Sequence, residues 1–184
     1  DVIQPLSDLI ALEQRRGRKP ALRIDVSGAL ARLGLPHIEF DDRIAGHQQF
    51  DLKGAIGDFV VRRVDGVAAY QIACSWDDVA MGCDLVLRGA DLLPSTARQL
   101  LVLKALNLPE PKYAHAGLVV NANGERLAKR DNATALESLR EDGVGPDVVI
   151  RRLARLSGLP DSADLNLLAE AFDINTLSAA DARA

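Results

Sequence analysis

Asp84-Leu85-Val86-Leu87-Arg88-Gly89, followed by a leucine-rich segment from Pro94 to Leu106, is the stretch that decides the fold. Residues 84–89 hold a short apolar run that ends in a charged residue and a glycine, a pattern that predicts a strand. Proline is favoured at the start of a helix, and the leucines that follow it predict a helix over 94–106. A strand followed directly by a helix is the building unit of α/β proteins.

Upstream of this unit the sequence predicts a β-hairpin. Residues 59–64 are largely apolar, and Asp65-Gly66 separates them from a second apolar run at 67–73. An Asp-Gly pair between two apolar runs favours a type I′ turn, so we expect both runs to be strands, with Tyr70 on the second. Residues 27–57 show few periodic segments and are expected to be irregular.

Downstream the pattern changes from strand to helix. A strand-like run covers 113–120, whereas the segment after Ala133 predicts three helices. The first has a capping box at Thr134–Glu137 and closes at Gly143. The second opens at Pro146, and the third runs from about Asp164 to Phe172. The predicted parts are an α/β part over 1–125, a linking loop over 126–132 and a helical part over 133–184.

Composition restricts the class of protein. A hydrophobic content of 48% permits a substantial core, and the net charge of −4 provides no overall basic field for nucleic acid, although local RNA contacts stay open. The chain contains no apolar run long enough to span a membrane and shows no signal peptide. Cys74 and Cys83 suggest no disulfide framework. We expect a cytoplasmic monomer without a membrane partner.

The loop Gly124-Glu125-Arg126-Leu127-Ala128-Lys129-Arg130-Asp131 concentrates positive charge after a strand-like run. A lysine on such a loop suits one chemical task, the neutralisation of phosphate charge that develops during a reaction. The competing interpretation is a solvated Lys-Arg pair on the surface.

These features occur in a characteristic order: residues 58–66, Ala69-Tyr70-Gln71-Ile72-Ala73, Asp77-Asp78, Leu87-Arg88-Gly89-Ala90-Asp91-Leu92, His115 and the basic loop. The order resembles the second half of the catalytic domain of class I glutamyl-tRNA synthetases. The glutamyl-queuosine tRNA(Asp) synthetases, short members without an anticodon-binding domain, resemble it most. The likeness covers 55–135 well and the helical tail more loosely. It implies the second half of a Rossmann-type α/β catalytic domain, followed by a small α-helical subdomain.

The resemblance assigns two residues to glutamate. Tyr70 matches the tyrosine that lines the amino-acid pocket, and Arg88 matches the arginine that binds the glutamate substrate. An arginine at the end of a strand lies where α/β sheets bind ligands, and its planar fork suits a carboxylate. The structural alternatives are an aromatic residue at the edge of the core for Tyr70 and an ion pair with Asp84 or Asp91 for Arg88.

The resemblance also assigns the basic loop to ATP. Lys129 matches the catalytic lysine of the class I signature loop, where ATP and the amino acid form aminoacyl-adenylate and pyrophosphate. Arg126 stands where lysine is common, Ala128 where serine is common, and Arg130 where a polar residue is frequent. We expect ATP, accompanied by Mg²⁺, to contact Arg126, Leu127, Ala128, Lys129 and Arg130.

No metal is expected to bind the protein chain itself. The three histidines, His37, His47 and His115, and the two cysteines do not show the spacing of zinc ligands. Asp77-Asp78 is interpreted as structural. The zinc cluster of the family would lie upstream of this chain.

The implied function is ATP-dependent activation of L-glutamate and its transfer to tRNA, either to the queuosine of tRNA(Asp) or to the 3′ end of tRNA(Glu). The sequence has no early His-x-Gly-His-type signature, which contacts ATP in the family. We therefore expect a fragment of an enzyme, inactive alone, because a Rossmann sheet without half its strands leaves a long exposed edge. The alternative is a non-catalytic paralogue that binds RNA or another protein.

Overall fold

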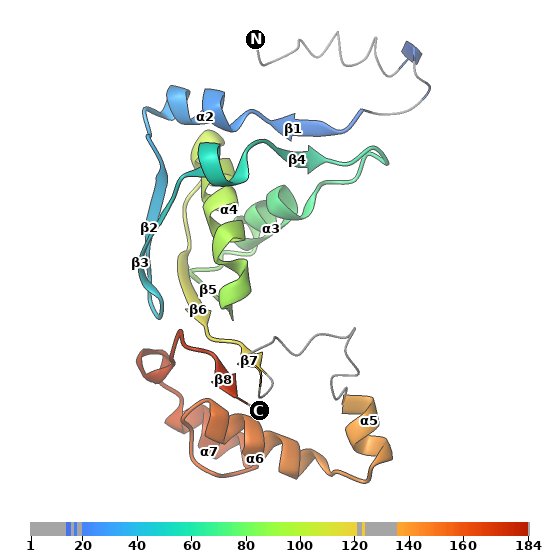
Figure 1. The fold of residues 1–184 in the computed structure, drawn as a ribbon, viewed down its shortest axis with the longest axis vertical. Helices are drawn as coiled ribbons and strands as arrows, with labels where there is room; N and C mark the ends of the chain where they lie inside the picture. The colour runs from blue at the N-terminus through green and yellow to red at the C-terminus, as the bar shows by residue number, and fades with distance from the viewer. Residues whose placement is uncertain (1–13, 16, 18–19, 121–122, 124–135, 184) are drawn as a thin grey trace. The chain divides into compact units, whose positions relative to one another are not determined.

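The computed structural model describes residues 14–15, 17, 20–120, 123 and 136–183. They form a mixed α/β structure that divides into two compact units (Figure 1). Among the described residues, the first unit holds 14–15, 17, 20–41, 47–86 and 92–113, and the second holds 42–46, 87–91, 114–120, 123 and 136–183. No helix in the described ranges is long and apolar enough to cross a membrane.

The principal sheet has four strands in the order β3-β2-β6-β5. Its strands are β2 (Ile38–Asp42), β3 (Gly46–Phe50), β5 (Leu85–Gly89) and β6 (Lys112–Ala116). Helix α4 (Leu93–Ala105) connects β5 to β6, its neighbour in the sheet, and Pro94 lies in its first turn. The predicted strand–helix unit and the α/β fold class are therefore confirmed. A separate two-stranded sheet pairs β1 (Leu22–Ile24) with β4 (Phe59–Arg62) in antiparallel register.

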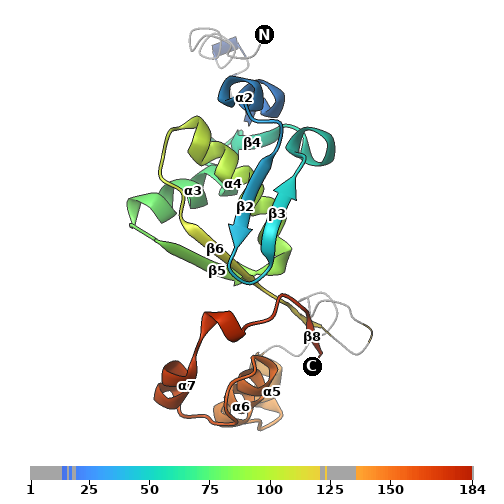
Figure 2. The ribbon, with the colours of Figure 1, turned by 90° about the vertical axis from the view of Figure 1, so that its left-hand side faces the viewer.

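The core of the first unit is built around α4. Leu100, Leu101 and Leu103 on this helix are almost completely buried. Leu100 and Leu101 pack with apolar residues of β2, β6 and helix α2 (Val26–Leu33). Helix α3 (Tyr70–Ala80) packs on α4, and both helices lie on the same side of the four-stranded sheet (Figure 2). Burial of these side chains is the main stabilising contribution to the unit.

The predicted hairpin at Asp65-Gly66 is present only as a turn closed by one antiparallel bridge, between Arg62 and Ala68. The backbone N–H of Arg63 donates to the carbonyl of Val67 at 2.9 Å, so the chain does reverse there. The second predicted strand, 67–73, is wrong, because after Ala69 the chain enters α3. Ile72, Ser75 and Val79 recur at helical spacing on the less exposed side of that helix. Packing of this face on α4 overrides the strand-like composition.

The prediction that residues 27–57 are irregular is also wrong. This segment contains most of α2, both strands β2 and β3, and one π-helical turn, η1 (Leu52–Ile56). Strand β3 reads Gly-His-Gln-Gln-Phe, so it carries little apolar signal of its own. It is a strand because the neighbouring β2 supplies its hydrogen-bond partners.

The second unit contains the C-terminal helices. They are α5 (Leu136–Glu141), α6 (Pro146–Leu156) and α7 (Leu165–Ala171), followed by a 3₁₀ turn, η3 (Ile174–Thr176). Strand β7 (Val119–Val120) pairs in parallel with β8 (Ala182–Arg183). The described parts of the three predicted helices are confirmed. Gly143, at φ 76°, ends the first, Pro146 opens the second, and Asp164 caps the third. The boundaries proposed around 126–132 lie outside the described residues.

Candidate functional site

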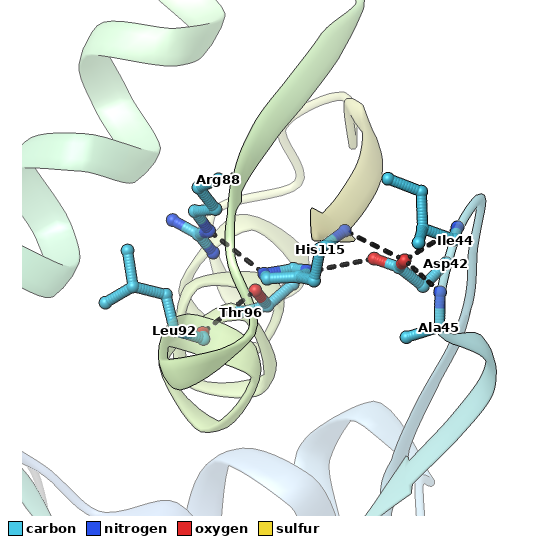
Figure 3. A network of polar contacts seen from close by, with 7 residues as sticks. All are labelled: Asp42, Ile44, Ala45, Arg88, Leu92, Thr96 and His115. Carbon is cyan, nitrogen blue, oxygen red and sulfur yellow. Dashed lines mark hydrogen bonds and ion pairs between the residues drawn. The ribbon is translucent and has the colours of Figure 1, made fainter. Parts of the chain in front are cut away.

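Three polar side chains meet at the carboxyl ends of three neighbouring strands (Figure 3). Asp42 is the last residue of β2, and His115 and Arg88 each lie one residue before the ends of β6 and β5. Since β6 lies between β2 and β5, the side chain of His115 reaches both neighbours. All three residues belong to the second unit. The carboxyl edge of an α/β sheet is the usual place for a ligand.

Asp42 is a buried carboxylate with a full set of hydrogen bonds. Its Oδ1 accepts backbone N–H groups from Ala45 at 2.8 Å, Ile44 at 3.0 Å and His115 at 3.0 Å. Its Oδ2 lies 2.5 Å from Nδ1 of His115. Burial alone opposes the negative charge, but the hydrogen bonds from Ala45, His115 and Ile44 together hold the pKa of Asp42 below its ordinary 3.8. The group is therefore ionised at neutral pH.

His115 is a buried neutral imidazole. Its side chain has no exposed surface, and this burial lowers its pKa below the ordinary 6.5. Asp42 opposes that shift, whereas the positive charge of Arg88 adds to it. Arg88 Nε lies 3.1 Å from Nε2 of His115. A guanidinium can only donate, so Nε2 must accept and Nδ1 must carry the ring proton that is donated to Asp42.

Arg88 is the predicted glutamate-binding residue, and the structure places it within this network. Its side chain is half-buried, and its Nε donates to a neutral ring. Asp91, one of the two ion-pair partners considered from the sequence, is close enough to act electrostatically on His115. Hydrogen bonding through Nε restrains rotation of the guanidinium, whose other two nitrogens carry the remaining donors.

The other predicted site residues are not brought into this network. Tyr70 is the first residue of α3, in the first unit, and its exposed fraction is 52%. Its predicted place on a hairpin strand is wrong, whereas its proposed role in the amino-acid pocket stays a prediction. The loop residues Arg126, Leu127, Ala128, Lys129 and Arg130 lie outside the described residues.

Metal-ligand candidates are scattered in the described ranges. No group of three or more His, Cys, Asp and Glu side chains within them is arranged to hold a metal ion. His37, just before β2, contacts Glu39 at 3.1 Å, and His47 on β3 contacts Asp41 at 2.9 Å and Glu39 at 4.0 Å. Both Cys74 and Cys83 are half-buried free thiols.

Sequence reasoning missed the roles of Asp42 and His115. His115 carried a signal, since it is an ionisable residue within the otherwise apolar run Tyr113–Val120. Asp42 ends a strand in a segment that was expected to be irregular. The two residues are separated by 73 positions, so only the order of the strands brings them together.

Comparison with known proteins finds relatives of this chain among the synthetases for glutamate. A glutamyl-Q tRNA(Asp) synthetase from Symbiobacterium thermophilum is 46% identical over 154 residues, which cover 83% of this chain and 46% of that protein. Glutamate–tRNA ligase 1 from Methylococcus capsulatus is 44% identical over 149 residues, covering 79% and 32% respectively. The chain thus spans about a third to a half of the length of these relatives.

A solved structure supports the fold. The crystal structure of a glutamate-tRNA synthetase from Elizabethkingia anophelis superimposes with a TM-score of 0.69 at 24% identity, covering all of this chain and 47% of that one. The model of the family described as tRNA synthetases class I (E and Q), catalytic domain, matches residues 13–178. Since this match takes in nearly the whole sequence and confirms the family predicted from the order of the motifs, the chain belongs to the catalytic domain of the class I tRNA synthetases for glutamate and glutamine.

Proposed function

We propose that the protein containing this chain activates L-glutamate with ATP and transfers it to tRNA. The observation that carries the proposal is the placement of Arg88. Its guanidinium stands at the carboxyl end of β5, fixed by a buried histidine, in a chain of the glutamate and glutamine synthetase family. A restrained guanidinium at a ligand-binding edge suits the recognition of a carboxylate.

Each proposed site residue has a distinct role. Arg88 binds a carboxylate of glutamate, and Tyr70 supplies an apolar wall and one hydroxyl to the amino-acid pocket. Lys129, supported by Arg126 and Arg130, stabilises the negative charge on the phosphates as the amino-acid carboxylate attacks the α-phosphorus of ATP. Mg²⁺ enters with ATP and shields phosphate charge. We assign none of the described residues to it.

Glutamate-dependent exchange between ATP and pyrophosphate in the full-length protein tests this proposal. We expect Arg88→Ala to lower kcat/KM for glutamate by about 100-fold, as loss of a charge-assisted contact predicts, with little change in KM for ATP. Arg63→Ala is the matched control, because Arg63 is exposed and pairs with Asp65 at 2.8 Å. An Arg88→Ala enzyme with the glutamate dependence of the wild type would show that this residue does not bind the substrate.

The same assay tests the basic loop. We expect Lys129→Ala to lower kcat of exchange by about 100- to 1,000-fold, the usual cost of removing one group that stabilises transition-state charge. Undiminished exchange in Lys129→Ala would mean that the loop is not the catalytic signature. Absence of glutamate-dependent exchange in the wild-type full-length protein would favour the non-catalytic binding module.

The acceptor is decided by charging assays on two tRNAs side by side. Relatives named as glutamyl-Q tRNA(Asp) synthetases and as glutamate–tRNA ligases match this chain at similar identity. We propose the queuosine of tRNA(Asp) as the first acceptor to test, and the 3′ end of tRNA(Glu) as the second. Attachment to queuosine-containing tRNA(Asp), lost when queuosine is absent, would identify the first. Stable charging of tRNA(Glu) would identify the second.

A further inference from the structure

We propose that Asp42 and His115 are positioning residues for Arg88. The tautomer of His115 holds the guanidinium in the orientation that binds the substrate carboxylate. The inference rests on the proposed role of Arg88 in glutamate binding. The two residues contact Arg88 directly and through one another, and the substrate need not touch either of them.

The first step of the argument is the geometry of the guanidinium. His115 accepts the Nε–H of Arg88, so any hydrogen bonds to a substrate carboxylate are made by the Nη1 and Nη2 donors of the guanidinium. The group that restrains Nε is a neutral ring, which places no negative charge directly on the guanidinium (Figure 3). A carboxylate in the same position would restrain the side chain equally well but would weaken its attraction for an anionic substrate.

The second step is the choice of tautomer. Oδ1 of Asp42 is occupied by the backbone N–H groups of Ile44, Ala45 and His115. Oδ2 is therefore the oxygen that faces the ring of His115. An ionised carboxylate can only accept, so it requires a proton on Nδ1 and leaves a lone pair on Nε2 for Arg88. Asp42 thus acts on Arg88 through the ring.

Replacing Asp42 with asparagine separates this role from a merely structural one. The backbone N–H groups around Oδ1 require the amide oxygen of the new residue at that position, so its NH₂ must face Nδ1 of His115. The ring would then accept at Nδ1 and carry its proton on Nε2. Two N–H donors would face each other, and the hydrogen bond between His115 and Arg88 would be lost. The same change of tautomer inactivates serine proteases when the triad aspartate becomes asparagine.

The experiment measures both substrates in the full-length Asp42→Asn enzyme. We expect KM for glutamate to rise about tenfold or more, as loss of one positioning hydrogen bond predicts, while KM for ATP stays close to the wild-type value. Nitrogen NMR of the imidazole should show the proton moved from Nδ1 to Nε2. Asp41→Asn is the matched control. Asp41 is the adjacent residue of β2, is 90% exposed, and also contacts a histidine, His47. The Asp41→Asn enzyme should keep the wild-type KM values for glutamate and for ATP.

The possible outcomes are distinct. A switched tautomer with an unchanged KM for glutamate overturns the proposal, as does an equal rise in the KM values of both substrates. If Asp42→Asn does not fold, His115→Gln and His115→Leu replace it. The glutamine retains an acceptor for Arg88, so its KM for glutamate should be clearly lower than that of the leucine variant. Equal values overturn the proposal. Failure of Arg88→Ala to affect glutamate binding would instead remove the proposed function.

Discussion

At the scale of a single residue, His115 couples the stability of the fold to pH. Its pKa in the folded chain lies below the ordinary 6.5, chiefly because the ring is buried, and the charged groups acting on it are Asp42, Arg88 and Asp91. The unfolded chain binds a proton near pH 6.5, whereas the folded chain resists doing so. The free energy of unfolding should thus fall as pH decreases below 6.5 and should not depend on His115 above that value.

Thermal unfolding of the full-length protein between pH 7.5 and 5 checks this prediction. We expect the wild-type Tm to fall below pH 6.5, and the fall to be smaller in His115→Gln, which has no ring to protonate. His47→Gln, on the exposed strand β3, leaves His115 in place and should keep the wild-type slope. The pKa of Asp42 in the folded chain lies below its ordinary 3.8. The stability that the ionised carboxylate contributes is therefore complete above pH 3.8 and is lost only as the pH falls further, outside this window. Identical slopes in wild type and His115→Gln would refute the prediction.

The residue scale also shows what sequence could predict of the site. Arg88 was predicted because strand and glycine signals surround it and because its motif resembles the family. Its partners were not predicted, because a hydrogen bond between residues 73 positions apart depends on which strands become neighbours. The order β3-β2-β6-β5 places β6 beside β2, which lies far upstream in the chain, and no local pattern encodes that arrangement.

At the scale of an element, helix α2 depends on a distant cap. The helix has only eight residues, and its own N-cap residue, Asp25, makes no side-chain capping hydrogen bond. Asp58, just before β4, supplies the missing acceptor, since its Oδ1 accepts the backbone N–H of Val26 at 2.9 Å. A short helix gains little from intrinsic propensity, so this contact should contribute measurably to its stability.

Substitution of the two aspartates tests the distant cap. We expect Asp58→Ala to lower the free energy of unfolding by about 1 kcal/mol, the typical cost of losing a helix cap. Asp25→Ala removes the carboxylate from the conventional capping position and should cost clearly less. Urea denaturation followed by circular dichroism measures both. A larger loss in Asp25→Ala than in Asp58→Ala would show that the helix is capped locally.

Elements were predicted well where a local signal and the tertiary environment agree. The β5–α4 unit and the described parts of the C-terminal helices combine apolar periodicity with proline, glycine or aspartate at their ends, and the structure confirms them. The strand predicted at 67–73 was wrong because a short apolar run does not by itself distinguish a strand from a helix. Helix α3, which begins within this run, packs on α4, and this contact selects the helix.

At the scale of the whole molecule, the two units differ in how much apolar surface each one buries. Most of the buried apolar side chains belong to the first unit, centred on Leu100–Leu103 of α4. Among the described residues of the second unit the buried apolar side chains are Ala114, Val120, Ala154 and Leu168. Val148 and Leu153 of α6 are half-exposed. Since buried apolar area is the main source of stability, the second unit should be the less stable one.

Hydrogen exchange on the full-length protein, read by mass spectrometry, tests this difference at the level of elements. We expect amides of α4 to exchange only through global unfolding and amides of α6 to exchange at least about tenfold faster, through local opening. Leu101→Ala, which opens a cavity in the core, should strongly accelerate amide exchange in α4, whereas Leu153→Ala should leave the exchange of α4 unchanged. Equal protection of α4 and α6 would contradict the prediction and would mean that another part of the full-length protein covers the exposed face of α6. In that case Leu153→Ala should weaken the contact between α6 and the part that covers it, and should accelerate amide exchange in α6. This result would distinguish a covered helix from one that is stable by itself.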